Sequence, residues 1–175
     1  MAHPTTIGPA WALAFLAVYP PVMTAMRRRG AVSRRRVIAA SVFFLYALAV
    51  VAITVFPIRV REAEWAGAGW QDVIQVIPFY VTPVSFVLNV IMFVPFGVLV
   101  PLLWPRADAV RWLAGWAAGA SLGIELTQFV LWVSLGSHRT VDVNDLIANT
   151  AGALLGLLVL RTVVPRAEDR ARKAA

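Results

Sequence analysis

The sequence contains no cysteine and little charge. Without cysteine, disulfides, thiolate catalysis and cysteine metal sites are excluded. Only 14% of its 175 residues are charged and 60% are hydrophobic, which leaves too little polar surface for a soluble domain of this length. Acidic residues are scarce as well, with 9 Asp and Glu against 16 Lys and Arg. A mean hydropathy of +0.75 is typical of a chain that is folded in lipid.

Long stretches almost free of charge predict membrane-spanning helices, because a hydrocarbon core about 30 Å thick needs roughly 20 apolar residues as helix. We therefore predict an all-α polytopic transmembrane bundle of about five spans. The first span contains Pro20-Pro21, and Pro95 and Pro101 are expected to bend the third. The predicted spans are residues 7–26, 37–58, 85–104, 112–133 and 144–164.

The positive charges predict the orientation of these spans. Six arginines follow the first span, two lie between the third and fourth, and four arginines and a lysine lie at or beyond the end of the fifth. Only Arg59, Arg61 and Arg139 fall on the other side. The positive-inside rule then places the N-terminus outside and the C-terminus in the cytoplasm, as an odd number of spans requires. We expect a multi-pass protein of the cell membrane whose basic face contacts anionic lipids, and no nucleic-acid partner, because the basic runs flank spans.

Four regions are expected along the chain. Prolines at 78 and 83 break the apolar run before the third span, so Gln75–Phe79 is predicted to be interfacial or re-entrant. Oligomeric state does not follow from the sequence. The regions are 1–58 (two helices with a basic cytoplasmic loop), 59–84 (an outer loop with the interfacial segment), 85–164 (a three-helix core) and 165–175 (a charged cytoplasmic tail).

Polar side chains inside the apolar spans are the candidate functional residues, because such groups are costly in a bilayer and are functional by default. They recur at helical spacing, so that one face of the fourth span and one face of the fifth are polar. All map to the outer half of the membrane and predict a pocket open to the outside, walled by the last three spans. The candidate ligand-binding residues are Asn89, Ser121, Glu125, Gln128, Arg139, Asp142, Asp145 and Asn149.

Such a pocket can serve as a general acid or base, hold a cation or bind a polar headgroup. Glu125 and Asp145 are the candidate catalytic residues. Structural roles compete with these functions. Glu125 can form a structural pair with Gln128, Asn89 or Arg139, and Asp145 can be the N-cap or first-turn acid of the last helix. Asp142 can pair with Arg139. We expect no cofactor and assign no metal site, since His138 alone is weak support for one.

The motifs resemble those of the VanZ-like family. The similar pieces cover residues 77–156, and their order and spacing make the resemblance specific. Two positions depart from it: Gln75-Val76 stands where an Asn is expected, and Asn144 stands where the family commonly has a second acid. The pieces are Ile77-Pro78-Phe79, residues 89–97 (NVIMFVPFG), residues 121–128 (SLGIELTQ), residues 139–145 (RTVDVND), residues 149–152 (NTAG) and Gly156.

The resemblance implies envelope biology without supplying a reaction. The founding member is associated with low-level teicoplanin resistance, and relatives with envelope and antimicrobial-peptide phenotypes. We therefore expect an envelope factor that binds an envelope lipid or lipid-linked ligand in the outer pocket. Two alternatives stay open: a small membrane enzyme that uses Glu125 or Asp145 on a lipid-linked or phosphate-bearing substrate, and a transporter or structural scaffold.

Overall fold

The computed structural model describes residues 5–28, 33–60, 69–137 and 140–164. Helices dominate this part of the chain, and the all-α bundle is confirmed. Four helices are long and apolar enough to cross a membrane: α2 (Arg34–Thr54), α4 (Pro83–Leu103), α5 (Val110–Leu135) and α6 (Val143–Val163). Their large apolar side chains are widely exposed, which is the surface expected to face lipid. The number of passes stays a prediction.

The first predicted span is two short helical pieces in one line. Pro9–Val18 is a 3₁₀ helix (η1), and α1 (Tyr19–Arg28) follows it. Pro20 and Pro21 have no N–H groups for the carbonyls of Leu16 and Ala17, so α-helical hydrogen bonding cannot continue through this point. Leu16 instead accepts from Tyr19 in the tighter pattern. The apolar part of this piece, Pro9–Ala25, is shorter than the four long helices.

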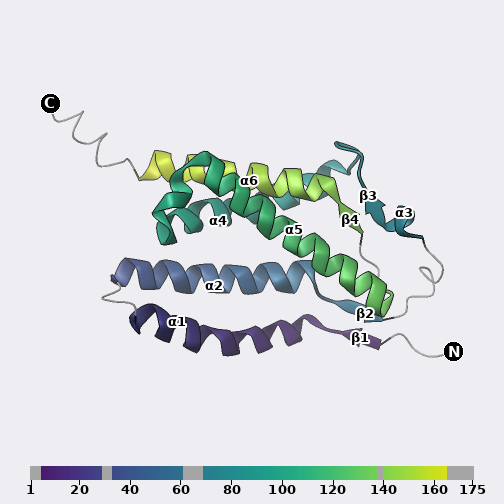
Figure 1. The fold of residues 1–175 in the computed structure, drawn as a ribbon, viewed down its shortest axis with the longest axis horizontal. Coiled ribbons are helices and arrows are strands. Elements are labelled where there is room, and N and C mark those ends of the chain that lie inside the picture. Colours follow the sequence, from purple (N-terminus) through teal and green to yellow (C-terminus); the bar gives the residue numbers. More distant parts are fainter. Residues whose placement is uncertain (1–4, 29–32, 61–68, 138–139, 165–175) are drawn as a thin grey trace.

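Successive helices run in opposite directions along the bundle (Figure 1). Short connections fit this arrangement, because antiparallel neighbours need only a turn between them. The 3₁₀ turn η3 (Pro105–Asp108) joins α4 to α5, and Gly136, in the left-handed conformation (φ 61°), ends α5. The most extensive packing is between α4 and α6, while α5 packs on α6 and α2 packs on α4 and η1.

The two ends of the bundle differ. We call one the strand end, because two small β ribbons lie there: β1 (Thr5–Ile7) pairs antiparallel with β2 (Ile58–Val60), and β3 (Ile74–Gln75) pairs parallel with β4 (Val141–Asp142). The short helix α3 (Trp70–Val73) leads into β3. We call the opposite end the arginine end, since it carries the start of α2, the α4–α5 turn and the end of α6, with Arg34, Arg35, Arg36, Arg106, Arg111 and Arg161.

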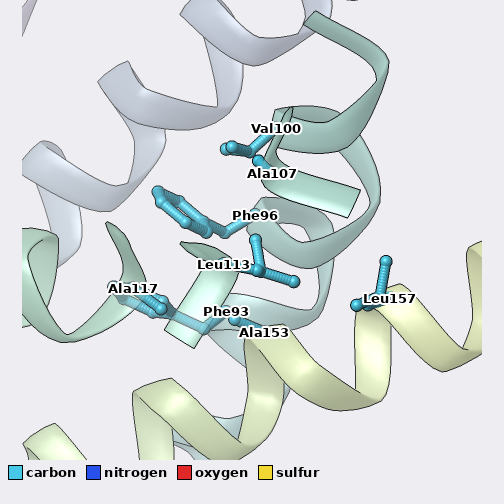
Figure 2. Close-up of a cluster of buried hydrophobic side chains, with 8 residues drawn as sticks. All are labelled: Phe93, Phe96, Val100, Ala107, Leu113, Ala117, Ala153 and Leu157. Atoms are coloured by element: carbon cyan, nitrogen blue, oxygen red, sulfur yellow. The ribbon is translucent and has the colours of Figure 1, made fainter. Parts of the chain in front are cut away.

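The arginine-end half of the bundle has an apolar core. Its buried side chains come from α4, η3, α5 and α6 (Figure 2), and Leu113, Ala117 and Ala153 are fully buried. Two polar contacts fasten this end: Arg36 donates to the terminal carbonyl of Leu103 (2.8 Å), and Arg161 pairs with Asp108 (3.3 Å). The cluster consists of Phe93, Phe96, Val100, Ala107, Leu113, Ala117, Ala153 and Leu157.

Candidate functional site

The predicted polar residues gather in the strand-end half of the bundle. The start of α4, the second half of α5 and the start of α6 contribute them; β3 and β4 lie beside the start of α6, and the end of α5 lies beside β2 (Figure 1). Helical spacing places Ser121, Glu125 and Gln128 on one face of α5, and all three are buried. The sequence prediction of a shared face on α5 is therefore confirmed. Asn149 of α6 is also buried, while Asn89, Asp142 and Asp145 are partly exposed.

Glycines set the distance between α4 and α6. A Cβ atom built on Gly152 would lie 2.1 Å from the carbonyl oxygen of Val90, and one on Gly156 would lie 2.1 Å from that of Val94. From the other side, a Cβ on Gly97 would lie 1.9 Å from the carbonyl oxygen of Ala153. Real side chains do not approach so closely, so the two backbones can touch only because these positions lack a Cβ. This contact fixes the polar start of α6 against that of α4.

Glu125 fastens the start of α6. Its carboxylate Oε2 accepts a hydrogen bond from the backbone N–H of Asp142 (2.9 Å), and only 4% of the residue is exposed. Its partner is therefore a backbone group of β4 rather than Gln128 or Asn89. Glu125 also interacts electrostatically with the carboxylates of Asp142 and Asp145. Buried in this way, the carboxylate holds the loop that leads into α6.

The sequence analysis gave Asp145 two alternative structural roles, the N-cap of the last helix or an acid in its first turn. In the structure, Asp142 has the first role and Asp145 has the second. Asp142 is the N-cap of α6, because its Oδ1 accepts from the backbone N–H of Asn144 (2.8 Å). Asp145 lies in the first turn, where a negative charge suits the helix dipole. Its Oδ1 accepts from Nδ2 of Asn89 (2.5 Å). The α4–α6 contact thus includes the predicted Asn89.

Asn144 holds the segment around Pro78 in place. It is fully buried, and its Oδ1 accepts from the backbone N–H of Phe79 (2.5 Å). Its Nδ2 donates to the carbonyl of Ile77 (3.1 Å) and to Oδ1 of Asp142 (2.8 Å), and lies 3.5 Å from the carbonyl of Tyr80. Phe79 has φ 63°, a value rare for a non-glycine residue. One side chain therefore holds a turn 65 residues away in the chain.

Two buried amides join neighbouring helices on either side of Glu125. Asn149 Nδ2 donates to Ser121 Oγ (2.8 Å), which links α6 to α5. Gln128 Nε2 donates to the carbonyl of Thr54 (3.0 Å), which links α5 to the end of α2. Two oxygen atoms, Gln128 Oε1 and Asn149 Oδ1, are buried without a partner among the described residues.

A cavity of about 800 Å³ lies beside these contacts, between the segment 71–85 and β4. Among the described residues, Asp142 is the only predicted site residue in its lining, and Glu125, Gln128 and Asn149 do not line it. The sequence analysis expected a pocket walled by three spans, whereas the wall consists largely of the segment that precedes α4. Polar lining comes from Gln71, Gln75, Thr82, Ser85, Thr140 and Asp142, and apolar lining from Val73, Ile74, Phe79, Tyr80, Val81 and Pro83.

Sequence reasoning missed the segment 71–85 as a wall and Asn144 as its support. The signal for Asn144 was its place between Asp142 and Asp145, but nothing in the spacing showed that its partners would be backbone atoms of the IPF motif. Arg139 and His138 lie outside the described residues, so their predicted roles stay predictions. Within the described residues, no three His, Asp or Glu side chains are placed to hold a metal ion.

The VanZ/LLP1 profile matches residues 43–164, which is more than two thirds of the chain. The chain belongs to the VanZ/LLP1 family. The VanZ/LLP1 region begins within α2 and runs to the end of α6, so it contains the cavity, the α4–α6 glycine contact and all the predicted site residues. No curated protein and no solved structure matches the chain.

Proposed function

We propose that this VanZ/LLP1 membrane protein is a cell-envelope factor that binds an envelope lipid or lipid-linked ligand at the outer leaflet. The observation that carries the proposal is the cavity at the strand end. Its volume of about 800 Å³ suits a small polar group. The lining combines amide, hydroxyl and carboxylate groups with aromatic and aliphatic groups, and this mixture suits an amphiphile. Membership of the VanZ/LLP1 family supports a relation to glycopeptide (teicoplanin) resistance.

The surroundings of the cavity also suit a ligand with an acyl or isoprenoid chain. Four apolar side chains next to it are highly exposed: Val76 (67%), Ile77 (58%), Phe79 (76%) and Tyr80 (71%). Exposed apolar and aromatic groups beside polar ones are typical of a membrane interface. A ligand could place its polar head in the cavity while its chain follows this surface into the bilayer. Anionic lipids are proposed as partners of the arginine end.

The alternative of a membrane enzyme has less support. Neither Glu125 nor Asp145 lines the cavity, and each accepts a hydrogen bond that fastens α6. A general acid or base must reach the reacting atom directly or through one water. The arrangement therefore favours positioning roles for both carboxylates and a binding role for the cavity.

Filling the cavity tests the proposal. Ser85 lines the cavity from the first turn of α4, whereas its neighbour Val84 is outside the lining and 69% exposed. Ser85→Phe should occupy the cavity, and Val84→Phe is the matched control on the same turn. We expect the purified wild-type protein and the Val84→Phe variant to retain an enriched lipid class by mass spectrometry, and Ser85→Phe to lose most of it.

The same variants should differ in cells. In a host deleted for the gene, Val84→Phe should restore the wild-type sensitivity to teicoplanin and Ser85→Phe should not. A wild-type protein whose lipids match the bulk membrane, or a Ser85→Phe variant that retains the same lipid, would contradict the binding proposal. A converted lipid that accumulates only with active protein would instead favour the enzyme alternative.

A further inference from the structure

The two unpartnered amide oxygens lie on either side of Glu125. Gln128 is three residues from Glu125 along α5, toward the strand end, and Ser121, the partner of Asn149, is four residues away toward the arginine end. At 1.5 Å per residue these steps are about 4.5 Å and about 6 Å. Gln128 is 8% exposed and Asn149 1%. The buried polar face therefore has three levels along α5: Gln128, then Glu125, then the Ser121–Asn149 pair. The first and the last level each contain one amide oxygen without a partner in the described part of the chain.

Reversing either amide does not remove the unpaired polar groups. Gln128 Nε2 donates to the carbonyl of Thr54, which can only accept, so this amide has one possible orientation. If the amide of Asn149 is reversed, its oxygen can accept from the Ser121 hydroxyl, but its two N–H groups then lose their partner. An unpaired buried polar group costs about 1–3 kcal/mol. Two such groups beside a buried carboxylate indicate that something else completes their hydrogen bonds.

The polar face stops abruptly toward the arginine end. One turn beyond Ser121 lies Ala117, and one turn beyond Asn149 lies Ala153, both with no exposed surface. Phe93 and Leu113 fill the space next to them (Figure 2). This apolar packing, which we call the plug, consists of Phe93, Leu113, Ala117 and Ala153. It offers no hydrogen-bonding side chain, so polar contacts end at the Ser121–Asn149 pair.

Toward the strand end, the polar face meets the cavity. Glu125 is bonded to the backbone of Asp142, and Asp142 lines the cavity. Among the described residues, β4 thus links the buried carboxylate to the cavity, whereas the plug lies between that carboxylate and the arginine end.

We propose that water fills a half-channel that runs from the cavity past Glu125 and ends at the Ser121–Asn149 pair. One water completes the hydrogen bonds of Gln128 Oε1, and another completes those of the Asn149 amide. Glu125, between the two levels, is a further partner for each, and a buried water needs two to four such partners. Glu125 is then reached by water and protons from the strand end alone.

Water fits this face better than a bound cation. A cation needs several oxygens around one point, but the two lone oxygens belong to levels about 10 Å apart along α5. Separate waters suit this spacing, because each needs only hydrogen-bonding partners at its own level.

Silver labelling of single cysteines tests the half-channel, because the natural chain has no cysteine. Ag⁺ is small and reacts with the thiolate, which forms where water solvates the sulfur and is suppressed in apolar surroundings. We expect Gln128→Cys and Ser121→Cys to react with Ag⁺ at least about tenfold faster than Leu113→Cys and Ala117→Cys. The reaction is followed in the purified, folded protein as protection of the thiol from later alkylation, measured by mass spectrometry.

Either half of the inference can fail separately. If Ser121→Cys reacts as slowly as Leu113→Cys, the polar face is dry and the half-channel does not exist. If Leu113→Cys reacts as fast as Ser121→Cys, water passes the plug and access is not one-sided. Each variant must first elute as a single folded species in size exclusion.

A second measurement uses the wild-type protein and so does not depend on how the variants fold. If water fills the half-channel, the side-chain amide protons of Gln128 and Asn149 should receive magnetisation from water in NMR spectra, whereas the methyl protons of Leu113 and Ala117 should not. Absence of transfer at Gln128 and Asn149 would overturn the inference whether or not the cysteine variants fold.

Discussion

Asn144 shows how one side chain can hold a segment from far away in the chain. Its oxygen accepts from the N–H of Phe79 and its nitrogen donates to the carbonyl of Ile77. These backbone groups have no helix or sheet to satisfy them, since the segment around Pro78 is irregular. The Asn144 side chain therefore satisfies backbone hydrogen-bonding groups of this turn, as a neighbouring strand does for a strand in a sheet. The wall of the cavity depends on it.

Replacing Asn144 should loosen that wall. Asn144→Leu leaves the N–H of Phe79 without its partner, at a cost of about 1–3 kcal/mol if the group stays buried, and leaves the carbonyl of Ile77 only its bond from the N–H of Tyr80 (3.3 Å). We expect the amide of Phe79 to exchange with deuterium much faster and the melting temperature to fall. Hydrogen–deuterium exchange of residues 76–82 measures the first effect. Unchanged exchange there would show that the segment is held by other contacts.

Asn144→Asp separates the contribution of the acceptor oxygen of Asn144 from that of its donor nitrogen. It keeps an oxygen for the N–H of Phe79 but loses the donor to Ile77 and brings a carboxylate against that of Asp142. Exchange at Phe79 should be slower than in Asn144→Leu and faster than in the wild-type protein. The amide of Ser85, which bonds to Thr82 at the start of α4, provides the internal control.

Periodicity predicted which polar residues share a face, but not which atoms they touch. Ser121, Glu125 and Gln128 follow helical spacing, and burial of all three confirms that face. The partner of Glu125 is a backbone N–H, and that of Gln128 is a backbone carbonyl of α2. Backbone partners carry no residue-type signal, so a sequence pattern cannot show them. The same limit explains why Asn144 was missed.

At the scale of the element, local capping residues and prolines determine where the helices begin and end. Four of the five predicted spans correspond to α2, α4, α5 and α6, with ends shifted by one to four residues. Thr82 accepts from the N–H of Ser85 as the N-cap of α4, and Pro83 occupies the first position, where its missing N–H costs nothing. The predicted start at Ser85 overlooked this cap. Pro83 was read as a break, whereas it begins the helix.

The α4–α6 contact should not tolerate a single added methyl group. Gly152→Ala places a Cβ against the backbone of Val90, which cannot move away without separating the helices. Overpacking of this kind typically costs about 1–3 kcal/mol. We expect a clear fall in the melting temperature of the detergent-solubilised protein.

Gly119→Ala is the matched control for that change. Gly119 is also helical, but a Cβ there meets nothing within 4 Å. Alanine is favoured over glycine in a helix interior by about 1 kcal/mol, so this variant should be as stable as the wild-type protein or more so. Equal losses in the two variants would mean that the α4–α6 distance is not what limits stability.

At the scale of the whole molecule, charge separates the two ends. Described arginines at the start of α2, in the α4–α5 turn and at the end of α6 share the arginine end, and the carboxylates of Asp142 and Asp145 lie at the other. The sequence predicted this division from loop charges alone, because the alternation of spans places every second loop on the same side. Which end faces the cytoplasm is a property of the membrane and stays a prediction.

Cysteine labelling in intact cells tests that orientation. Thr140 at the strand end and Ala109 at the arginine end are both exposed, and neither carries charge, so their replacement leaves the topology signals intact. A membrane-impermeant maleimide should label Thr140→Cys in intact cells and Ala109→Cys only after lysis. The reverse pattern would place the cavity at the cytoplasmic leaflet and overturn the proposed outer-leaflet ligand.

The β1–β2 ribbon has a consequence for how the molecule meets other chains. Thr5–Ile7 covers one edge of Ile58–Val60, next to the end of α2. An uncovered strand edge is a template on which another extended chain can add itself. Loss of those three residues would therefore do more than shorten the N-terminus: it would expose a strand edge with which another extended chain can pair. In its native form, the protein keeps that edge occupied by its own chain.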